Sequence, residues 1–353
     1  MKILFIADGC HPGTQGGIQT FGRALKKMFK KDLTFLSYYT LSEKIFKVED
    51  VIEILTPNII FRIFDKVFCR IPRNYITKKN IKKINPDICI LRSPQNLKSL
   101  KNIKCKKILV QHLNFDKYFK VKDYYNNESS LIKSSKKDLD YFVVTSPKDK
   151  EKLIEFYGFP KEKIKLIRHS CDTELLNTIL KIKSKNLIMI ARLYNSHKRF
   201  DLAIKAMKNL PDFNLKIYGS GPDKELLEKI IFENDIKNVQ LCGATNQVKE
   251  KLNEAGIFVM TSDFEGYPIT SIEAMRRGLP IILRDTFEGA SDVVINNGIL
   301  LGPEWNEKDF CDGIRKIYDN YEYYSRNSIE MGKRHSLEVI KKEWEKLFKE
   351  CEK

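Results

Sequence analysis

The stretch that decides the fold begins with Ile257-Phe258-Val259-Met260, continues through Glu265-Gly266-Tyr267-Pro268-Ile269-Thr270-Ser271-Ile272-Glu273 and ends with Pro280-Ile281-Ile282-Leu283. The two outer apolar runs have the length of buried strands, and the segment between them is a Gly/Pro loop followed by an apolar helical pattern. Strand, loop, helix and strand form a βαβ unit, which predicts a parallel sheet. Glu265 then lies at the carboxyl end of its strand, the edge where open α/β sheets bind ligands.

The same alternation of short apolar runs and helical patterns extends over the whole 353-residue chain. Apolar runs that predict strands lie at 2–7, 33–37, 87–91, 107–111, 141–145, 164–168, 187–191, 215–218 and 239–241. We therefore expect two α/β domains with parallel sheets wound on both faces, residues 1–170 and 186–329, joined by a linker at 171–185. A helical stripe of apolar residues follows within 330–353.

Positive charge is concentrated in the first half of the chain. Residues 1–170 contain 35 Lys and Arg against 17 Asp and Glu, whereas the remaining 183 residues contain 28 against 29. This asymmetry predicts that the first domain faces an anionic partner, such as nucleic acid, an anionic membrane surface or a phosphorylated acceptor. Residues 59–73 form a basic amphipathic pattern, continued by Lys78, Lys79, Lys82 and Lys83, which suits a membrane interface or, equally, a core-packed helix with a charged exterior.

Cysteine usage and hydropathy indicate a cytosolic protein. The eight cysteines are scattered and form neither a Cys-x-x-Cys pair nor a Cys/His cluster, so we expect reduced thiols. The first apolar run, Ile3 to Ala7, is too short for a signal peptide, and no apolar run has the roughly 18 residues that span a bilayer. Asp138 and Asp140 form an Asp-x-Asp triplet, but it precedes a strand, so we expect a solvated helix end.

Two cations and two carboxylates are expected at one edge of the second sheet. Arg192 follows a strand and Lys198 precedes a helix, so both lie at the carboxyl edge that carries Glu265. Cations beside carboxylates suit a ligand with anionic and hydroxyl-rich parts, such as a nucleoside diphosphate sugar. Plainer interpretations stay open: Arg192 and Lys198 as surface cations, Glu265 as a loop charge, and Glu273 as the end of a capping box that starts at Thr270.

The first domain offers a glycine loop and a histidine at its own carboxyl edge. Gly13, Gly16 and Gly17 open the first helix, where backbone N–H groups can approach an anion, although a tight strand-to-helix turn needs the same glycines. No Gly-Lys-Ser/Thr follows, so the loop is not a P-loop. His112 follows the strand at 107–111, which favours a functional role as much as a structural one.

Taken together, these residues resemble the retaining glycosyltransferases of family 4. The segment from Glu265 to Glu273, continued as Ala274-Met275-Arg276-Arg277-Gly278-Leu279-Pro280, is similar to that family's signature, and Arg192 with Lys198 and Gly16 with Gly17 match it in spacing and order. The resemblance covers nearly the whole chain and is strongest over 187–302. It implies the GT-B fold, in which two Rossmann-like doubly wound domains face each other across a cleft and a C-terminal helix, here within 330–353, crosses back to the first domain.

The resemblance also implies a role for each candidate residue. Arg192 and Lys198 grip the donor diphosphate with the help of Gly16 and Gly17, Glu265 contacts hydroxyls of the donor sugar, and His112 approaches the transferred sugar. Glu273 binds the ribose, and Gly243 lies where similar proteins contact the base. The loop residues next to Glu265 supply backbone contacts to the donor: Gly266, Tyr267, Pro268, Ile269 and Thr270.

The expected activity is transfer of a hexose or N-acetylhexosamine, with UDP as the favoured nucleotide, to a hydroxyl of a growing glycan. A basic first domain suggests a lipid-linked surface polysaccharide or lipopolysaccharide acceptor, and an enzyme that is cytoplasmic and peripherally associated with the inner face of the membrane. No metal or other cofactor is expected, because Arg192 and Lys198 neutralise the departing diphosphate.

Two alternatives and one departure from the family accompany this expectation. A sugar-nucleotide epimerase of the same architecture uses the same donor site, and a basic nucleic-acid-binding protein fits the charge but shows no recognisable nucleic-acid-binding motif. Family members read Asn-Gly-Val-Asp after the last strand of the first domain, whereas this chain reads His169-Ser170-Cys171-Asp172. That difference affects the expected hinge between the domains and the donor pocket.

Overall fold

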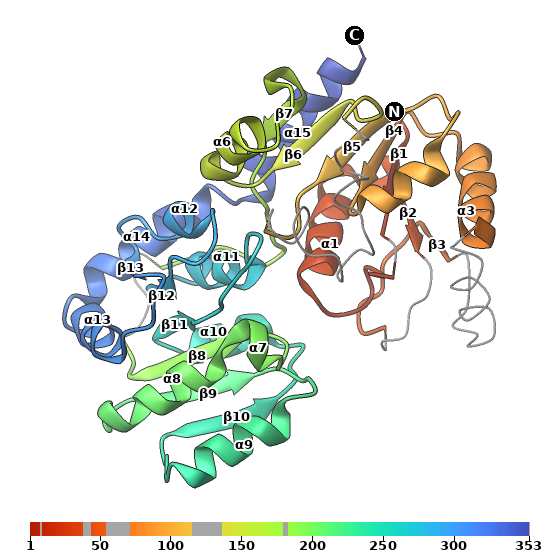
Figure 1. Cartoon of the computed structure of the whole chain (residues 1–353). Helices are drawn as coiled ribbons and strands as arrows, with labels where there is room; N and C mark the ends of the chain where they lie inside the picture. The colour runs from red at the N-terminus through yellow and green to blue at the C-terminus, as the bar shows by residue number, and fades with distance from the viewer. Residues whose placement is uncertain (8, 38–43, 54–70, 115–135, 179–182, 353) are drawn as a thin grey trace. The chain divides into compact units, whose positions relative to one another are not determined.

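A computed structural model describes residues 1–7, 9–37, 44–53, 71–114, 136–178 and 183–352, with side chains at 71–73 not described. The chain divides into two compact units, one made of Met1–Asp172 with Leu337–Lys353 and the other of Thr173–Ser336 (Figure 1). Of the segment 171–185, which we expected to be a linker, residues 171–172 are counted with the first unit and 173–185 with the second. Most of the basic pattern at 59–73 lies outside the described residues.

The described strands of the first unit form one parallel sheet in the order β3-β2-β1-β4-β5-β6-β7. These strands are β1 (Ile3–Ile6), β2 (Leu33–Ser37), β3 (Val51–Glu53), β4 (Ile88–Leu91), β5 (Lys106–Val110), β6 (Tyr141–Val144) and β7 (Ile164–Leu166). The α-helices are α1 (Gly17–Phe29), α3 (Ile71–Ile84), α6 (Pro147–Glu155) and α15 (Leu337–Cys351). The three-residue strand β3 was not predicted, because so short an apolar run carries little periodicity.

The last helix completes the core of the first unit. Helix α15 places Trp344, Leu347 and Phe348 in the cluster that covers one face of the sheet, and the Trp344 side chain is only 1% exposed. The Trp344 ring lies 6.4 Å from Phe21 of α1, and Phe348 lies 5.1 Å from Phe29, between ring centroids. The apolar stripe seen in the sequence is therefore the buried face of α15.

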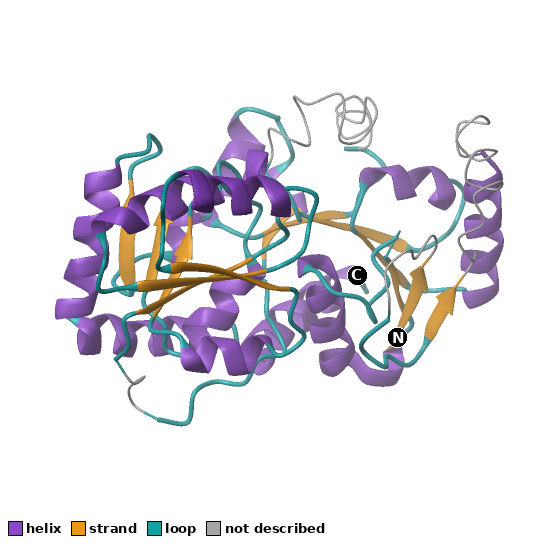
Figure 2. Cartoon of the chain, turned by 90° about the horizontal axis from the view of Figure 1, so that it is seen from below, coloured by secondary structure: helices purple, strands orange, loops and turns teal. Residues whose placement is uncertain are grey.

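The second unit contains a parallel sheet in the order β10-β9-β8-β11-β12-β13. Its strands are β8 (Asn186–Ile190), β9 (Asn214–Tyr218), β10 (Val239–Gly243), β11 (Ile257–Met260), β12 (Ile281–Arg284) and β13 (Gly298–Leu301). Its α-helices are α7 (Asn195–Lys198), α8 (Phe200–Ala206), α9 (Lys224–Glu233), α10 (Val248–Glu254), α11 (Ile269–Arg276), α12 (Ala290–Val293), α13 (Glu307–Asp319) and α14 (Tyr321–Lys333). Figure 2 shows helices on both faces of this sheet, as its continuous apolar strands predict.

The strand order creates a switch point between β8 and β11. These two strands are hydrogen-bonded neighbours, yet the chain leaves β8 toward one side of the sheet and leaves β11 toward the other. The loops that follow them therefore diverge at the carboxyl edge, and ligands bind at such points in open α/β sheets. Arg192, Lys198 and Glu265 all belong to these two connections.

Glycines at the end of β9 allow the neighbouring loop to approach closely. A Cβ atom on Gly219 would lie 1.9 Å from the carbonyl oxygen of Ala191, and one on Gly221 would lie 2.2 Å from that of Leu193. Gly219 N also donates to the carbonyl of Gly243, at 2.8 Å. The Gly219-x-Gly221 pattern is thus explained by packing beside the loop that carries Arg192.

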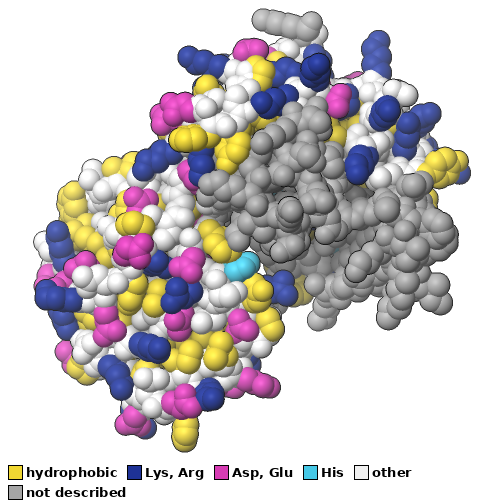
Figure 3. Space-filling model, in the orientation of Figure 1, with side chains coloured by type: hydrophobic (Ala, Val, Ile, Leu, Met, Phe, Trp, Pro, Cys, Tyr) yellow, Lys and Arg dark blue, Asp and Glu magenta, His cyan; other side chains and the backbone are white. Residues whose placement is uncertain are grey.

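The surface reflects the uneven charge of the sequence. Figure 3 shows basic and acidic side chains interspersed over the second unit, as its near-neutral composition requires. In the first unit, the exposed side of α3 carries Lys79, Lys82 and Lys83 together with Tyr75. Among the residues that the structure describes, no helix combines the length and apolar character needed to cross a membrane.

Candidate functional site

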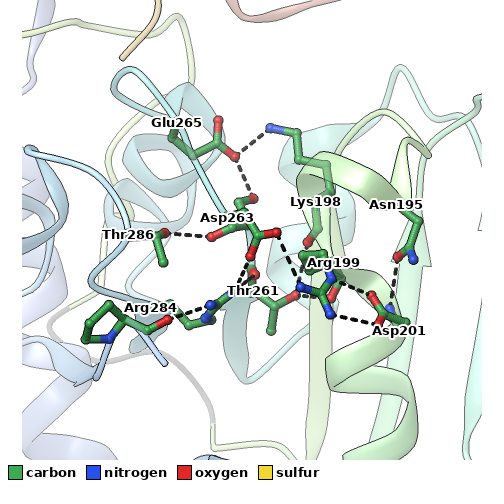
Figure 4. A network of polar contacts seen from close by, with 11 residues as sticks. Asn195, Lys198, Arg199, Asp201, Thr261, Asp263, Glu265, Arg284 and Thr286 are labelled. Atoms are coloured by element: carbon green, nitrogen blue, oxygen red, sulfur yellow. Dashed lines mark hydrogen bonds and ion pairs between the residues drawn. The ribbon is translucent and has the colours of Figure 1, made fainter. Parts of the chain in front are cut away.

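The structure joins Lys198 to Glu265 at the switch point of the second sheet. Lys198 is the last residue of α7, after β8, and Glu265 lies in the loop between β11 and α11. Lys198 Nζ lies 2.5 Å from Glu265 Oε1, and Ser262 Oγ donates to the same oxygen at 2.7 Å (Figure 4). The Glu265 side chain is 11% exposed and that of Lys198 25%, so the pair is only partly shielded from water.

Arg192 lies two residues beyond the end of β8 and is exposed. Its position after the strand agrees with the sequence pattern. Because β8 occupies the centre of the sheet, Arg192 lies at the same carboxyl edge as Lys198. An exposed guanidinium there is accessible to an anionic ligand.

Glu273 lies on α11 and is 7% exposed. Thr173 Oγ1 donates to Glu273 Oε1 at 3.4 Å. The capping-box interpretation of this residue is wrong, because the helix starts at Ile269 with Pro268 at the N-cap, and no side chain caps it. The N-cap lies two residues before Thr270, so Glu273 is an interior helix residue.

The loop before α11 is anchored by Tyr267. Gly266, Tyr267 and Pro268 are buried, and Tyr267 Oη donates to Asp292 Oδ2 at 3.1 Å. Arg334 Nη2 donates to the other oxygen of Asp292, at 3.1 Å, and His335 Nε2 lies 3.4 Å from Tyr267 Oη. Ile269 is buried as the first residue of α11, and Thr270 follows half-buried.

Gly243 ends β10 in a left-handed conformation, with φ of 75°. A Cβ atom at this position would meet no other heavy atom within 4 Å among the described residues. The glycine is therefore required by its backbone conformation, and the space beside it is open.

In the first unit, Gly16 and Gly17 form the start of α1. Gly16 is the N-cap residue, with φ of 142°, and both glycines are exposed. The first turn of α1 contains no acidic residue. Arg23 fixes the preceding loop, since its Nη1 donates to the carbonyls of Pro12 at 3.0 Å and Thr14 at 3.1 Å. Free N–H groups at a helix start attract anions, and glycine leaves them accessible.

His112 follows β5 and packs among aromatic rings. Its ring is stacked on His169 with centroids 5.4 Å apart, and Phe21 contacts both rings edge-on or tilted, at 5.0 and 4.9 Å. Burial lowers the pKa of His112 well below its ordinary value, and the nearby charges of His169 and Arg92 lower it further. His169 belongs to the segment that departs from the family pattern, and the local sequence gave no sign of its contact with His112.

The Asp-x-Asp triplet precedes β6, and Asp138 is exposed, as expected; a helix before it would lie outside the described residues. Residues 136–138 form a turn before β6, and Asp140 Oδ2 accepts a hydrogen bond from the backbone N of Lys107 at 2.8 Å. This contact ties the start of β6 to β5. Within the described part of the chain, no group of three or more His, Cys, Asp or Glu side chains is arranged to hold a metal ion.

Three charged residues of the second unit were missed by the sequence analysis. Arg199, Asp263 and Arg284 form a network next to the Lys198–Glu265 pair (Figure 4). Arg199 and Asp263 lie close to Lys198 and Glu265 in the sequence, where they look like ordinary surface charges. Arg284 is the last residue of β12, and nothing in the sequence indicates that its side chain contacts Asp263 in the loop after β11.

Comparison with known proteins defines the class to which these features belong. The structure of HepE from Anabaena in complex with UDP and glucose shares the fold of the whole chain, with a TM-score of 0.77, 14% identity and coverage of 99% of this chain and 100% of that one. The fold is therefore the GT-B fold of glycosyltransferases. The family model described as "Glycosyl transferases group 1" matches residues 173–334. This match lies within the second unit, which is similar to the group 1 glycosyltransferases.

Curated relatives agree with this assignment. An uncharacterized glycosyltransferase of Haemophilus influenzae is 31% identical over 182 residues, which cover 49% of this chain and 51% of that protein. The O-antigen biosynthesis glycosyltransferase WbnH of Escherichia coli is 28% identical over 190 residues, or 54% of each chain. The chain spans about half the length of these curated relatives.

Proposed function

We propose that this protein is a retaining glycosyltransferase that moves a hexose or N-acetylhexosamine from a UDP-sugar to a hydroxyl of a growing surface glycan. The observation that carries the proposal is the Lys198–Glu265 pair at the switch point of a group 1 glycosyltransferase unit. A cation and a carboxylate held together suit a ligand in which a diphosphate adjoins sugar hydroxyls. The relatives reported above are named glycosyltransferases, which favours transfer over epimerisation.

Each candidate residue has a role in this proposal. Lys198 and Arg192 bind the diphosphate, and Glu265 accepts hydrogen bonds from hydroxyls of the donor sugar. Glu273 accepts from the ribose hydroxyls, and the open space beside Gly243 admits the base. The loop from Gly266 to Thr270 contributes backbone N–H groups at the start of α11, which is the positive end of that helix.

In the first unit, Gly16 and Gly17 offer N–H groups to the diphosphate, and His112 offers its ring to the transferred sugar. A buried imidazole whose pKa is lowered stays neutral near pH 7, so it donates or accepts a hydrogen bond without adding a charge. These three assignments rest on the family resemblance and on the exposed or carboxyl-edge positions of the residues.

The reaction requires more stabilisation of the leaving group than of the bound donor. The bond from the anomeric carbon to the diphosphate oxygen breaks, the bond to the acceptor oxygen forms on the same face, and the acceptor proton passes to the diphosphate. Negative charge grows on the diphosphate, so cations aimed there act mainly in the transition state. One charge-assisted hydrogen bond contributes about 1.5–3 kcal/mol, whereas enzymes lower barriers by roughly 8–23 kcal/mol, so several groups must act together.

The proposed lipid-linked acceptor is inferred from the positive charge of the first unit. The exposed basic side of α3, with Lys79, Lys82 and Lys83 beside Tyr75, gives the first unit a surface suited to an anionic membrane and a lipid-linked acceptor. Each Lys near an anionic leaflet contributes about 1 kcal/mol. Binding to vesicles with anionic lipid that weakens as salt is added, and absence of binding to neutral vesicles, tests this part of the proposal.

A ligand screen tests the donor. A thermal shift is measured with UDP-, GDP- and ADP-sugars, because a ligand that binds the folded state raises the melting temperature by mass action. We expect stabilisation by a UDP-sugar and its loss in Glu273→Gln, whereas Glu228→Gln, an exposed glutamate paired with Lys224, keeps it. Failure of every nucleotide sugar to stabilise the chain at millimolar concentration would overturn the proposal.

A further inference from the structure

The backbone that carries Lys198 is attached to the loop that carries Glu265. Thr261 Oγ1 donates to the carbonyl oxygens of Arg199, at 2.7 Å, and Lys198, at 3.1 Å. The backbone N of Asp263 donates to the carbonyl of His197 at 2.9 Å. The connection after β8 and the connection after β11 are thus held together on both sides of Lys198 (Figure 4).

The side chain of Asp263 also helps to hold the two connections together. Its Oδ1 lies 2.6 Å from Arg284 Nη1, and its Oδ2 lies 3.3 Å from Arg199 Nη1. Asp263 thereby links the end of β12 to the junction of α7 and α8. The Asp263 side chain is 34% exposed, so its role does not depend on deep burial.

The two arginines that hold Asp263 are themselves fixed. The Arg284 side chain is 7% exposed and also donates to the carbonyls of Thr261 at 3.0 Å and Pro303 at 2.5 Å. Arg199 pairs with both oxygens of Asp201, each at 3.1 Å. A carboxylate between two anchored guanidinium groups has little freedom to move.

Arg199 also has an unusual backbone conformation. Its φ of 49° and ψ of 46° are left-handed, which costs a side-chain-bearing residue free energy and needs support from its surroundings. This conformation ends α7 immediately after Lys198 and starts α8. The position of the Lys198 backbone therefore depends on the contacts that hold Arg199 in place.

We propose that Asp263, held between Arg199 and Arg284, is a positioning residue that places Lys198 for contact with the donor diphosphate. The inference rests on the proposed function. A lysine side chain is long and flexible, so its ammonium can be aimed only if its backbone is fixed. A displacement of about 1 Å at a group that must meet its target costs about 100-fold in rate.

Kinetics of Asp263→Asn test the inference. The substitution keeps the size of the side chain and removes the charge that holds both arginines. We expect kcat to fall about 10- to 100-fold, with the dissociation constant for UDP changed less than threefold, because ribose and base contacts are made elsewhere. Asp212→Asn is the matched control, since Asp212 is 76% exposed and lies 3.9 Å from Lys185 at its nearest salt-bridge contact.

A double-mutant cycle separates positioning from general loss of structure. If Asp263 acts through Lys198, Asp263→Asn in a Lys198→Ala background lowers kcat less than threefold further. A loss by the same factor in both backgrounds would show that Asp263 does not act through Lys198 and would overturn the inference. Arg199→Lys serves as a second variant if Asp263→Asn does not fold, because it keeps the charge but cannot bridge Asp201 and Asp263; an undiminished kcat there also overturns it.

The outcomes distinguish this inference from the proposed function. If the unmodified protein transfers sugar and Asp263→Asn matches it in kcat, the positioning role is wrong and the transferase function stands. If the unmodified protein neither binds nor uses any nucleotide sugar, the proposed function fails and the inference fails with it.

Discussion

Lys198 and Glu265 are bonded to each other, with 2.5 Å between Nζ and Oε1, although they follow different strands of the sheet. The cation proposed for the diphosphate and the carboxylate proposed for the sugar thus form an ion pair with one another. A donor that is bound by both groups exchanges this contact for two new ones, which lowers the net gain from binding.

Removal of the ammonium is expected to abolish most turnover. In Lys198→Ala, one charge-assisted hydrogen bond to the leaving diphosphate is lost, which corresponds to about 1.5–3 kcal/mol and a fall of roughly 10- to 150-fold in kcat/KM. Glu265 loses its partner at the same time. Steady-state release of UDP measures the effect. Lys205→Ala, an exposed lysine on α8, is the matched control; full activity of Lys198→Ala would refute the diphosphate role.

Loss of the Glu273 carboxylate is expected to weaken donor binding. Glu273→Gln keeps the shape of the side chain but weakens the hydrogen bonds that a carboxylate accepts, so KM for the donor rises about 10-fold while kcat changes little. Titration calorimetry with UDP alone checks the same contact without the sugar. A variant with normal UDP affinity and a reduced kcat would assign Glu273 to the reacting end of the donor.

Chelation is expected to leave the activity intact. Arg192 and Lys198 supply positive charge where the diphosphate departs, so a metal ion is not needed to neutralise it. Activity after incubation with EDTA and removal of the chelator should equal that of the untreated enzyme. A loss that Mg²⁺ or Mn²⁺ restores would contradict the proposed charge balance.

Substitution by alanine is expected to lower stability by very different amounts at two glycines of the carboxyl edge. Gly219→Ala puts a Cβ atom 1.9 Å from the Ala191 carbonyl oxygen, so we expect a loss of about 3 kcal/mol or more in the free energy of unfolding. Gly243→Ala meets no such atom and costs only the left-handed backbone strain, about 1–2 kcal/mol. Urea unfolding of both variants measures the difference, and equal losses would show that packing at Gly219 is not the constraint.

Acidification is expected to destabilise the protein through His112. Burial, followed by the charges of His169 and Arg92, holds the pKa of His112 well below its ordinary value of 6.5. Below pH 6.5 the His112 side chain is therefore protonated in the unfolded state but not in the folded state. The free energy of unfolding then decreases as the pH falls from about 7 toward 5. The pKa of His11 is also lowered, first by burial, and contributes with the same sign.

The measurement compares the pH dependence of stability in two proteins. Urea unfolding of His112→Asn between about pH 7 and pH 5 should show a shallower decline than that of the unmodified protein. The slope is the quantity of interest, because the substitution can also change stability by a constant amount. An identical slope would mean that His112 is protonated equally in the folded and unfolded states.

Much of the fold follows from the sequence, because apolar runs such as 257–260 and 281–283 report the strands of a buried parallel sheet directly. The sequence also gives the positions of Arg192, Lys198 and Glu265 relative to their strands. What it does not give are contacts between elements far apart in the chain. Arg284 reaches Asp263, and His169 stacks on His112, through tertiary packing that leaves no local periodicity.

The local sequence also misled at one place. Thr270 to Glu273 has the composition of a capping box, yet the N-cap is Pro268, two residues before Thr270. The error arises because short polar motifs fit several local structures.

The separation of α15 from the rest of the first unit has a consequence for synthesis. Every residue of the second unit leaves the ribosome before Trp344 and Phe348 do, so the nascent chain can finish its later-encoded unit while Phe21 and Phe29 still lack the rings of α15. This apolar surface of the first unit stays uncovered until α15 has been synthesised. Premature termination shortly before Leu337 would therefore harm the part of the protein that was made first.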